Sequence, residues 1–99
     1  MNDLLILVET LQNLLISRAT GGEEKASEYT TLRQVIVTNA SLETVTPNFL
    51  KTCRTLDQFW QFIKYEYETY AERRQFIWKE FQPLLQQLEQ PNIGSEHVV

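Results

Sequence analysis

The chain has few of the residue types on which most catalytic and metal chemistry depends. Its 99 residues include one cysteine, Cys53, and one histidine, His97. A lone cysteine forms no internal disulfide, which favours a reducing, cytoplasmic location. A zinc site needs about four Cys, His or acidic ligands at suitable spacing, and the chain supplies no such set. We therefore expect neither a metal nor a cofactor.

Glycine, basic residues and long apolar runs are also scarce. The pair Gly21 and Gly22 lacks the glycine and lysine spacing of a phosphate-binding loop. Nine Lys and Arg against 13 Asp and Glu leave a net charge of -4, which argues against binding to nucleic-acid phosphates. The longest apolar run, 4–8, is too short to span a bilayer, and Asp3 and Glu9 stand where an export signal carries positive charge. We expect no nucleic-acid partner and no membrane partner.

Catalysis has two weak candidates. His97 lies in the tail, and a His–Cys or His–Asp pair would require the tail to fold back. Cys53 lies beside Arg54 near a helix start, a setting that can lower the pKa of a thiol. Burial as a small apolar residue is the interpretation we favour for it. No catalytic residue is therefore predicted.

Aromatic residues concentrate in one stretch, 52–89. It holds both tryptophans, four of the five phenylalanines and three of the four tyrosines. Its apolar spacing predicts two amphipathic helices that meet at a corner at 68–70, with the remaining helices covering their apolar face. Thr55 and Gln58 form a capping-box pattern at the start of the first helix. Pro83 predicts a kink or break in the second, because proline removes a backbone hydrogen bond and clashes with the preceding turn.

Three further helices are predicted earlier in the chain, over 3–18, 23–38 and 47–52. The apolar surface of the first extends beyond one stripe, so we expect it to be buried on more than one side or to have a second partner. The β-branched segment 35–38 would also suit a short strand, but no second strand signal accompanies it. Thr46 is expected to cap the third helix, because a proline follows it at the first helical position.

These elements predict an all-α fold, a compact bundle of five to six helices whose last helix is kinked at Pro83. A death-fold-like arrangement is one of the topologies open to it. The predicted domain spans 1–91, and 92–99 form a polar tail or the start of a linker.

The strongest functional signal is a group of aromatic and arginine side chains outside the main apolar stripes. Exposed aromatics beside arginines are typical of protein–protein interfaces. Arg73 and Arg74 stand near a helix start, where positive charge opposes the helix dipole. This penalty suggests an external or cross-helix acidic partner. The predicted partner-binding residues are Arg54, Phe62, Tyr65, Tyr70, Arg73, Arg74 and Trp78.

The same stretch resembles a known family. The segments that carry the resemblance are TCRT at 52–55, FWQFIK at 59–64, TYAERR at 69–74 and FQPLL at 81–85. Together they resemble the helical domain at the N-terminus of bacterial abortive-infection and effector-associated, death-fold-like conflict proteins. The acidic corner at 65–68 departs from the more basic or glycine-bearing corner expected there, and these 99 residues hold no effector.

The resemblance implies a recruitment or assembly module in bacterial antiviral defence. The leading hypothesis is thus a non-catalytic adaptor domain that binds a protein, either a like domain in a homo-oligomer or an effector. One alternative is a stand-alone inhibitory or antitoxin-like binding protein. Another is a small enzyme that uses Cys53, which predicts a low thiol pKa.

Overall fold

The computed structural model describes residues 3–89, which form five α-helices and one 3-10 helix and contain no strand. The all-α prediction is confirmed, and the predicted tail at 92–99, with His97, lies outside the described residues. The elements are α1 (Asp3–Ala19), α2 (Ala26–Val37), η1 (Ala40–Leu42), α3 (Asn48–Thr52), α4 (Leu56–Glu66) and α5 (Tyr70–Glu89).

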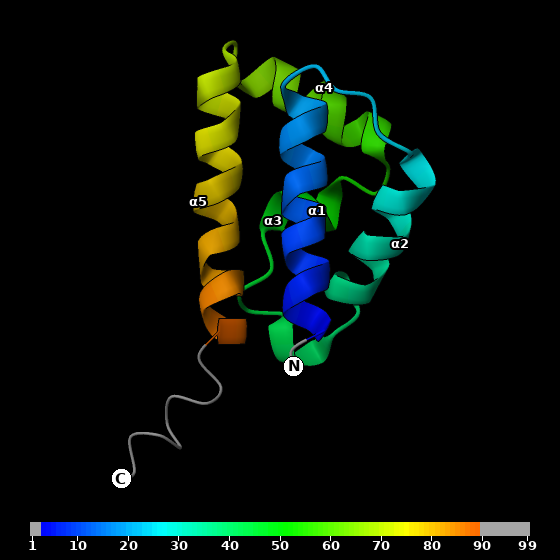
Figure 1. Cartoon of the computed structure of the whole chain (residues 1–99), viewed down its shortest axis with the longest axis vertical. Helices are drawn as coiled ribbons and strands as arrows, with labels where there is room; N and C mark the ends of the chain where they lie inside the picture. Colours follow the sequence, from blue (N-terminus) through cyan, green and yellow to red (C-terminus); the bar gives the residue numbers. More distant parts are fainter. Residues whose placement is uncertain (1–2, 90–99) are drawn as a thin grey trace, which may run out of the picture.

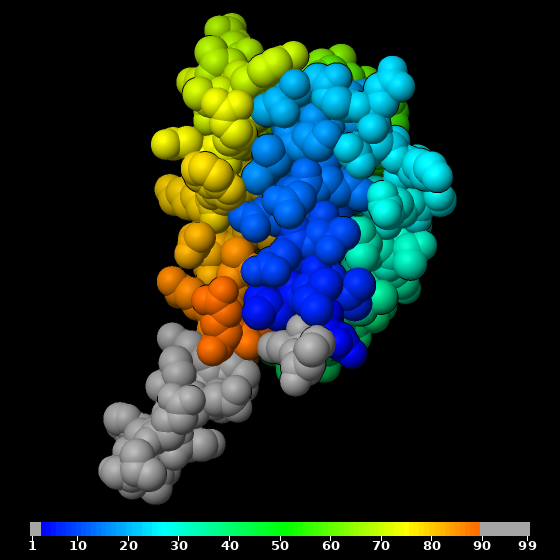
Figure 2. Space-filling view, in the orientation of Figure 1, coloured from blue at the N-terminus to red at the C-terminus, as the bar shows by residue number. Residues whose placement is uncertain are grey.

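Helix α1 is the centre of the bundle. It packs against α5, α2 and α4, and it lies antiparallel to α5 with α2 on its other flank (Figure 1). The two antiparallel helices fill much of one face of the molecule (Figure 2). The expectation that α1 is buried on more than one side is confirmed. The aromatic stretch is not the sole organiser, because α4 and α5 both pack on α1 more than on each other.

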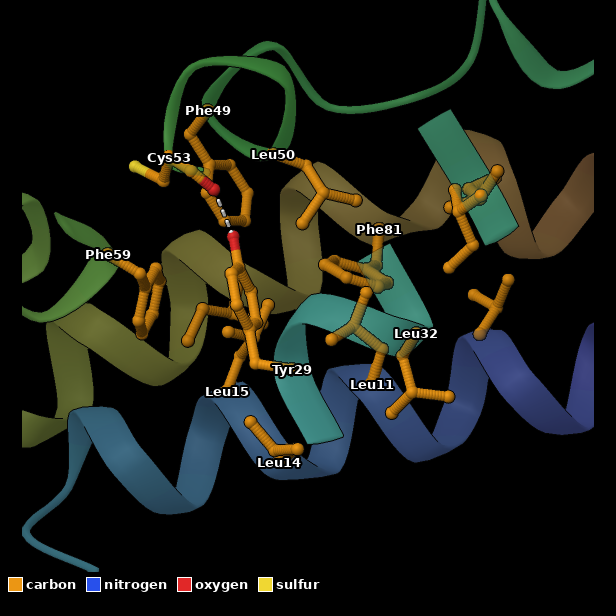
Figure 3. Close-up of a cluster of buried hydrophobic side chains, with 14 of the residues drawn as sticks. Leu11, Leu14, Leu15, Tyr29, Leu32, Phe49, Leu50, Cys53, Phe59 and Phe81 are labelled. Atoms are coloured by element: carbon orange, nitrogen blue, oxygen red, sulfur yellow. Dashed lines mark hydrogen bonds between the residues drawn. The ribbon is translucent and has the colours of Figure 1, made fainter. Parts of the chain in front are cut away.

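The core fills the space between these helices. Val8, Leu11 and Leu15 of α1 are fully buried, as are Tyr29 of α2 and Phe81 of α5. Figure 3 shows leucines of α1 pointing toward Tyr29 and toward the α5 side of the core. Each large apolar side chain that leaves water contributes about 1.5–3 kcal/mol, so this cluster supplies the main driving force for folding.

A glycine turn ends α1 and sets the path into α2. Gly21 has a φ of 100°, a left-handed conformation that suits glycine. The Gly22 N–H donates to the Ser17 carbonyl at 2.7 Å and the Gly21 N–H donates to the Arg18 carbonyl at 3.4 Å, a pattern that satisfies the last carbonyls of a helix. A Cβ at Gly21 would lie 2.9 Å from the Tyr70 hydroxyl. The turn therefore also brings the end of α1 against the start of α5.

Two capping boxes fix the starts of α4 and α5. The Gln58 N–H donates to Thr55 Oγ1 at 3.1 Å, and the Thr55 N–H donates to Gln58 Oε1 at 3.2 Å, as predicted. The Glu72 N–H donates to Thr69 Oγ1 at 3.1 Å, and the Thr69 N–H donates to Glu72 Oε1 at 3.2 Å. The second box follows the same pattern, with Glu in place of Gln three residues after the threonine, but it was not among the predictions.

One local prediction was wrong, and one of the two outcomes predicted at Pro83, the break, is excluded. Thr46 does not cap α3, because its hydroxyl donates back to the Leu42 carbonyl at 2.7 Å and Pro47 takes the N-cap position. Helix α5 does not break at Pro83 but continues through it. Because proline has no N–H, the Lys79 carbonyl loses the hydrogen bond that residue 83 would otherwise donate. Pro83 and Lys79 are both exposed, so water can bond this carbonyl instead.

A cluster of phenylalanines joins α3, α4 and α5. The ring of Phe49, on the five-residue α3, lies at its centre. The ring centroids of Phe59, Phe62, Phe76 and Phe81 lie 5.8, 5.9, 5.2 and 6.4 Å from that of Phe49. Such rings are within the range of favourable aromatic pairs. A helix as short as α3 is not stable alone, so this cluster holds it in place.

Candidate functional site

The structure divides the seven predicted partner-binding residues into two groups. Arg73 and Phe62 pack into the molecule. The other five reach solvent to different degrees: Arg54 is exposed, Tyr65 is 86% exposed, Tyr70 is 50% exposed, Arg74 is partly buried and Trp78 is 52% exposed.

Three of the five surface residues share one face of α5. Tyr70, Arg74 and Trp78 stand at positions i, i+4 and i+8, and residues four apart lie one above the other on a helix. We call these three residues the α5 ridge. Tyr65 lies in the last turn of α4, at the corner that leads into α5. Arg54 lies apart from the ridge in the link between α3 and α4.

Arg73 is a structural residue. It is 8% exposed, and its Nη1 donates to the Ala19 carbonyl at 2.9 Å. Its Nε donates to the Tyr67 carbonyl at 2.9 Å, and its Nη2 donates to the Glu68 carbonyl at 3.5 Å. The expected acidic partner of Arg73 is therefore replaced by three carbonyl oxygens. These carbonyls lie at the end of α1 and just after the end of α4, where no helical N–H groups remain to bond them. The guanidinium group of Arg73 supplies the missing donors.

Three cationic side chains surround the Trp60 ring at the end of the bundle where Arg73 lies. The guanidinium carbon of Arg18 lies 4.1 Å from its ring centroid, the Lys64 Nζ lies 5.1 Å from it, and the guanidinium carbon of Arg73 lies 5.6 Å from it. Arg73 also lies 5.5 Å from the Tyr70 ring. These cation–π contacts place positive charge beside the negative ends of α1 and α4. They were not predicted, although the Trp60–Lys64 spacing of four was a usable signal.

Phe62 is the second residue that the predictions misplaced. It is partly buried, and its ring stacks on that of Phe49 at 5.9 Å with an interplanar angle of 4°. It also lies 5.7 Å from Phe76. The sequence predicted that Phe62 projects outward, because the inner face of α4 excludes it. The short helix α3 covers that flank of α4 instead.

Cys53 lacks the properties of a nucleophile. It is 5% exposed, and burial raises its pKa, although a hydrogen bond to Thr52 and the charge of Arg33 act in the other direction. A reactive thiol needs a lowered pKa and access to solvent. The Cys53 carbonyl accepts a hydrogen bond from the Tyr29 hydroxyl in the core (Figure 3). The structure therefore fits the buried interpretation of Cys53 and offers no support for the enzyme alternative.

We expect the fold to lose stability in alkali because of these two buried groups. Burial raises the pKa of Tyr29 above its ordinary 10.0 and that of Cys53 above 9.0. As pH rises, the unfolded chain therefore loses these protons before the folded chain does. The contribution of these two groups to the free energy of unfolding should be constant below about pH 9 and fall above it, with Tyr29 contributing a loss of up to about 1.4 kcal/mol per pH unit above its ordinary pKa.

Urea unfolding between pH 7 and 11 measures this effect. Tyr29→Phe removes a buried donor and should lower the neutral-pH value by about 1–3 kcal/mol. The diagnostic is the slope, which should be shallower in Tyr29→Phe than in the native chain. Equal slopes would show that Tyr29 does not cause the alkaline loss.

The described residues offer no clear setting for catalysis or metal binding. Residues 3–89 contain no group of three or more His, Cys, Asp or Glu side chains placed to hold a metal ion. Their surface has shallow depressions. One of about 390 Å³ lies on the side of α5 that carries Glu72, Phe76 and Lys79, and it is lined by acidic, basic and aromatic side chains. Within the same residues no helix is both long and apolar enough to cross a membrane.

Comparison with known proteins leaves the family open. No protein-family model matches the chain, and no curated protein and no solved structure shows significant similarity to it. The arguments for function are therefore those of the residues and their geometry.

Proposed function

We propose that this chain is a non-catalytic protein–protein interaction domain that binds its partner through the α5 ridge. The observation that carries the proposal is the alignment of Tyr70, Arg74 and Trp78 on one exposed helix face. Tyr, Arg and Trp are the residue types that most often dominate binding energy at protein interfaces. The two aromatic rings on either side of the arginine are each half-exposed, although Tyr70 also packs against Arg73 and the end of α1.

Contacts within the domain hold the Tyr70 end of the ridge in place. The Thr69–Glu72 capping box fixes the first turn of α5, and the buried Arg73 ties that turn to the ends of α1 and α4. The Tyr70 ring lies against the Arg73 guanidinium. A preorganised surface loses less conformational entropy on binding, which suits a recognition site on a small domain.

The resemblance to conflict proteins supplies the proposed setting. In such proteins a helical domain of this kind precedes a separate effector, so this chain would recruit or assemble an effector in bacterial antiviral defence. Arg74 is the only charged member of the ridge, so an acidic group is the natural counterpart on the partner.

Trp78→Ala should weaken partner binding by about 30-fold or more, because an interface hot spot contributes at least about 2 kcal/mol. Ile6→Ala is the matched control, since Ile6 is 50% exposed on α1 and Trp78 is 52% exposed on α5. The experiment compares proteins captured from a bacterial lysate by native, Trp78→Ala, Arg74→Glu and Ile6→Ala chains, and then titrates the captured partner against each.

Binding lost in the two ridge variants and kept in Ile6→Ala supports the proposal. A partner that binds all four chains equally would rule out the ridge as its docking site. Far-ultraviolet circular dichroism of each variant checks that the fold is retained.

A further inference from the structure

The solvent face of α2 carries no charged residue from Thr30 to Thr38, and Glu28 is an exposed charge in the first turn of the helix. Helices α1, α4 and α5 all place charged residues on their outer faces, for example Glu9, Lys64 and Lys79. Helix α2 forms one edge of the molecule, away from α5 (Figure 2). A depression of about 520 Å³ lies on its outer side. We call the following exposed residues the α2 face: Ser27, Thr30, Thr31, Gln34, Val35 and Thr38.

The α2 face is more apolar than its composition suggests. The Thr30 hydroxyl donates to the Ala26 carbonyl at 2.9 Å, and the Thr38 hydroxyl donates to the Gln34 carbonyl at 2.6 Å. Because these hydroxyls bond to their own helix, their methyl groups are left to meet solvent. The face thus presents methyl groups around Val35, which is 39% exposed, together with the polar side chains of Ser27, Thr31 and Gln34.

Arg33 is the one charged residue between Thr30 and Thr38, and it turns away from this face. Its Nε donates to the Leu50 carbonyl at 2.8 Å, and its Nη2 donates to the Lys51 carbonyl at 2.9 Å. These contacts tie α2 to the end of α3. The Arg33 guanidinium is therefore bonded to the end of α3 and does not border the α2 face.

Helix stability does not explain this choice of residues. Exposed helix positions are best filled by Ala, Glu, Lys, Gln or Arg, and β-branched residues are less favourable there. Thr30, Thr31 and Val35 are all exposed and β-branched. Such side chains have little rotamer freedom to lose on contact. These residues favour the helix poorly and would lose little side-chain entropy on binding. We therefore infer that another protein covers this surface.

We propose that the α2 face binds the same face of a second copy of this chain, with the two α2 helices antiparallel about a two-fold axis. The inference rests on the proposed function in taking the domain to be an assembly module. The chain carries a net charge of -4, so two copies repel each other unless they meet through a neutral surface. Beyond Glu28 the α2 face is such a surface, and its own copy offers an equally uncharged counterpart.

The antiparallel arrangement also follows from charge. Glu28 borders the α2 face in the first turn of the helix. Antiparallel packing keeps the two Glu28 carboxylates at opposite ends of the contact, whereas parallel packing would place them together. A contact made mainly by one 12-residue helix from each copy belongs among the smallest specific interfaces. The dimer is therefore weak and depends on concentration.

The test is sedimentation velocity of the 99-residue chain from roughly 10 µM to 1 mM, a range suited to weak association. We expect a monomer–dimer equilibrium in the native chain and a monomer in Thr31→Glu. Gln61→Glu adds the same charge to an exposed site on α4 and should dimerise as the native chain does. Glu favours helix more than Thr does, so Thr31→Glu is expected to remain folded.

Salt and cross-linking give two further readouts. Raising the salt concentration should maintain or strengthen the dimer, because salt screens the repulsion between two anionic chains. A contact made by arginines would weaken instead. Gln34→Cys should be joined into a covalent dimer by a short bismaleimide, while Gln61→Cys and the native chain with its buried Cys53 should not.

A native chain that stays monomeric over the whole range overturns this inference, as does a dimer that Thr31→Glu leaves unchanged. Neither result bears on the α5 ridge, whose test is the loss of a captured partner in Trp78→Ala. A dimer that disappears in Trp78→Ala and persists in Thr31→Glu would assign self-association to the ridge and likewise overturn the role of α2.

Discussion

Arg73→Glu is expected to lower the free energy of unfolding by about 3–5 kcal/mol, the cost of leaving buried charge without its partners. The substitution removes three donors from the carbonyls of Ala19, Tyr67 and Glu68. It also places an anion beside oxygen atoms that already carry partial negative charge at helix ends. Since small domains are stable by about 5–15 kcal/mol, this loss is a large share of the total, and the variant should unfold at a clearly lower urea concentration than the native chain.

The control for this effect is the next residue along the chain. Arg74→Glu makes the same charge change at a partly buried position on the α5 ridge, and we expect it to change stability by less than about 1 kcal/mol. Arg73→Lys should fall between the two, because it keeps the charge but not the planar fork. Urea unfolding followed by circular dichroism measures all three. Equal stability of Arg73→Glu and Arg74→Glu would contradict the structural role of Arg73.

Phe49→Ala is expected to cost about 3–5 kcal/mol, the range for removing a large aromatic side chain from a core. Phe49 is 4% exposed and contacts four phenylalanine rings from α4 and α5. It is also the main aromatic anchor of the five-residue α3. Its loss leaves a cavity and releases α3, so the cost should lie toward the upper end of the range.

An exposed aromatic residue provides the comparison. Tyr65 is 86% exposed, and Tyr65→Ala should change stability by no more than about 0.5 kcal/mol. Hydrogen exchange separates the two contributions to the Phe49 effect. Amides of α3 should lose protection in Phe49→Ala before those of α1 do. A loss of less than about 1 kcal/mol would show that the aromatic cluster is not what holds α3.

Much of the secondary structure was predictable because its signals are local. The Thr55–Gln58 capping box needs only residues three apart, and the glycine turn at Gly21 needs only the conformational freedom of one residue. The β-branched segment 35–38 could have been a helix or a strand. It belongs to α2 as far as Val37, because a strand there would have needed a second strand to pair with. Pro83 misled in part, since an exposed proline can be tolerated where water replaces the lost bond.

The candidate site was only half predictable. Tyr70, Arg74 and Trp78 could be singled out by residue type, and their alignment on one face followed once α5 was known to begin at Tyr70. Arg73 was misassigned to the surface because adjacent helix residues differ by about 100° in direction. Which of Arg73 and Arg74 points inward depends on the position of α1, and this position cannot be predicted from the neighbouring residues in the sequence.

By itself the sequence determined the helices, their boundaries to within a few residues, the absence of strands in the described chain and the concentration of aromatic side chains. These properties follow from backbone preferences and from the spacing of apolar residues, which act over one or two turns. Only the tertiary structure decided that α1 is the central helix, that Arg73 joins three helix ends and that Phe62 stacks on Phe49. Each of these contacts joins segments distant in the chain, because burial and hydrogen bonding depend on what packs against a residue as well as on the residue itself.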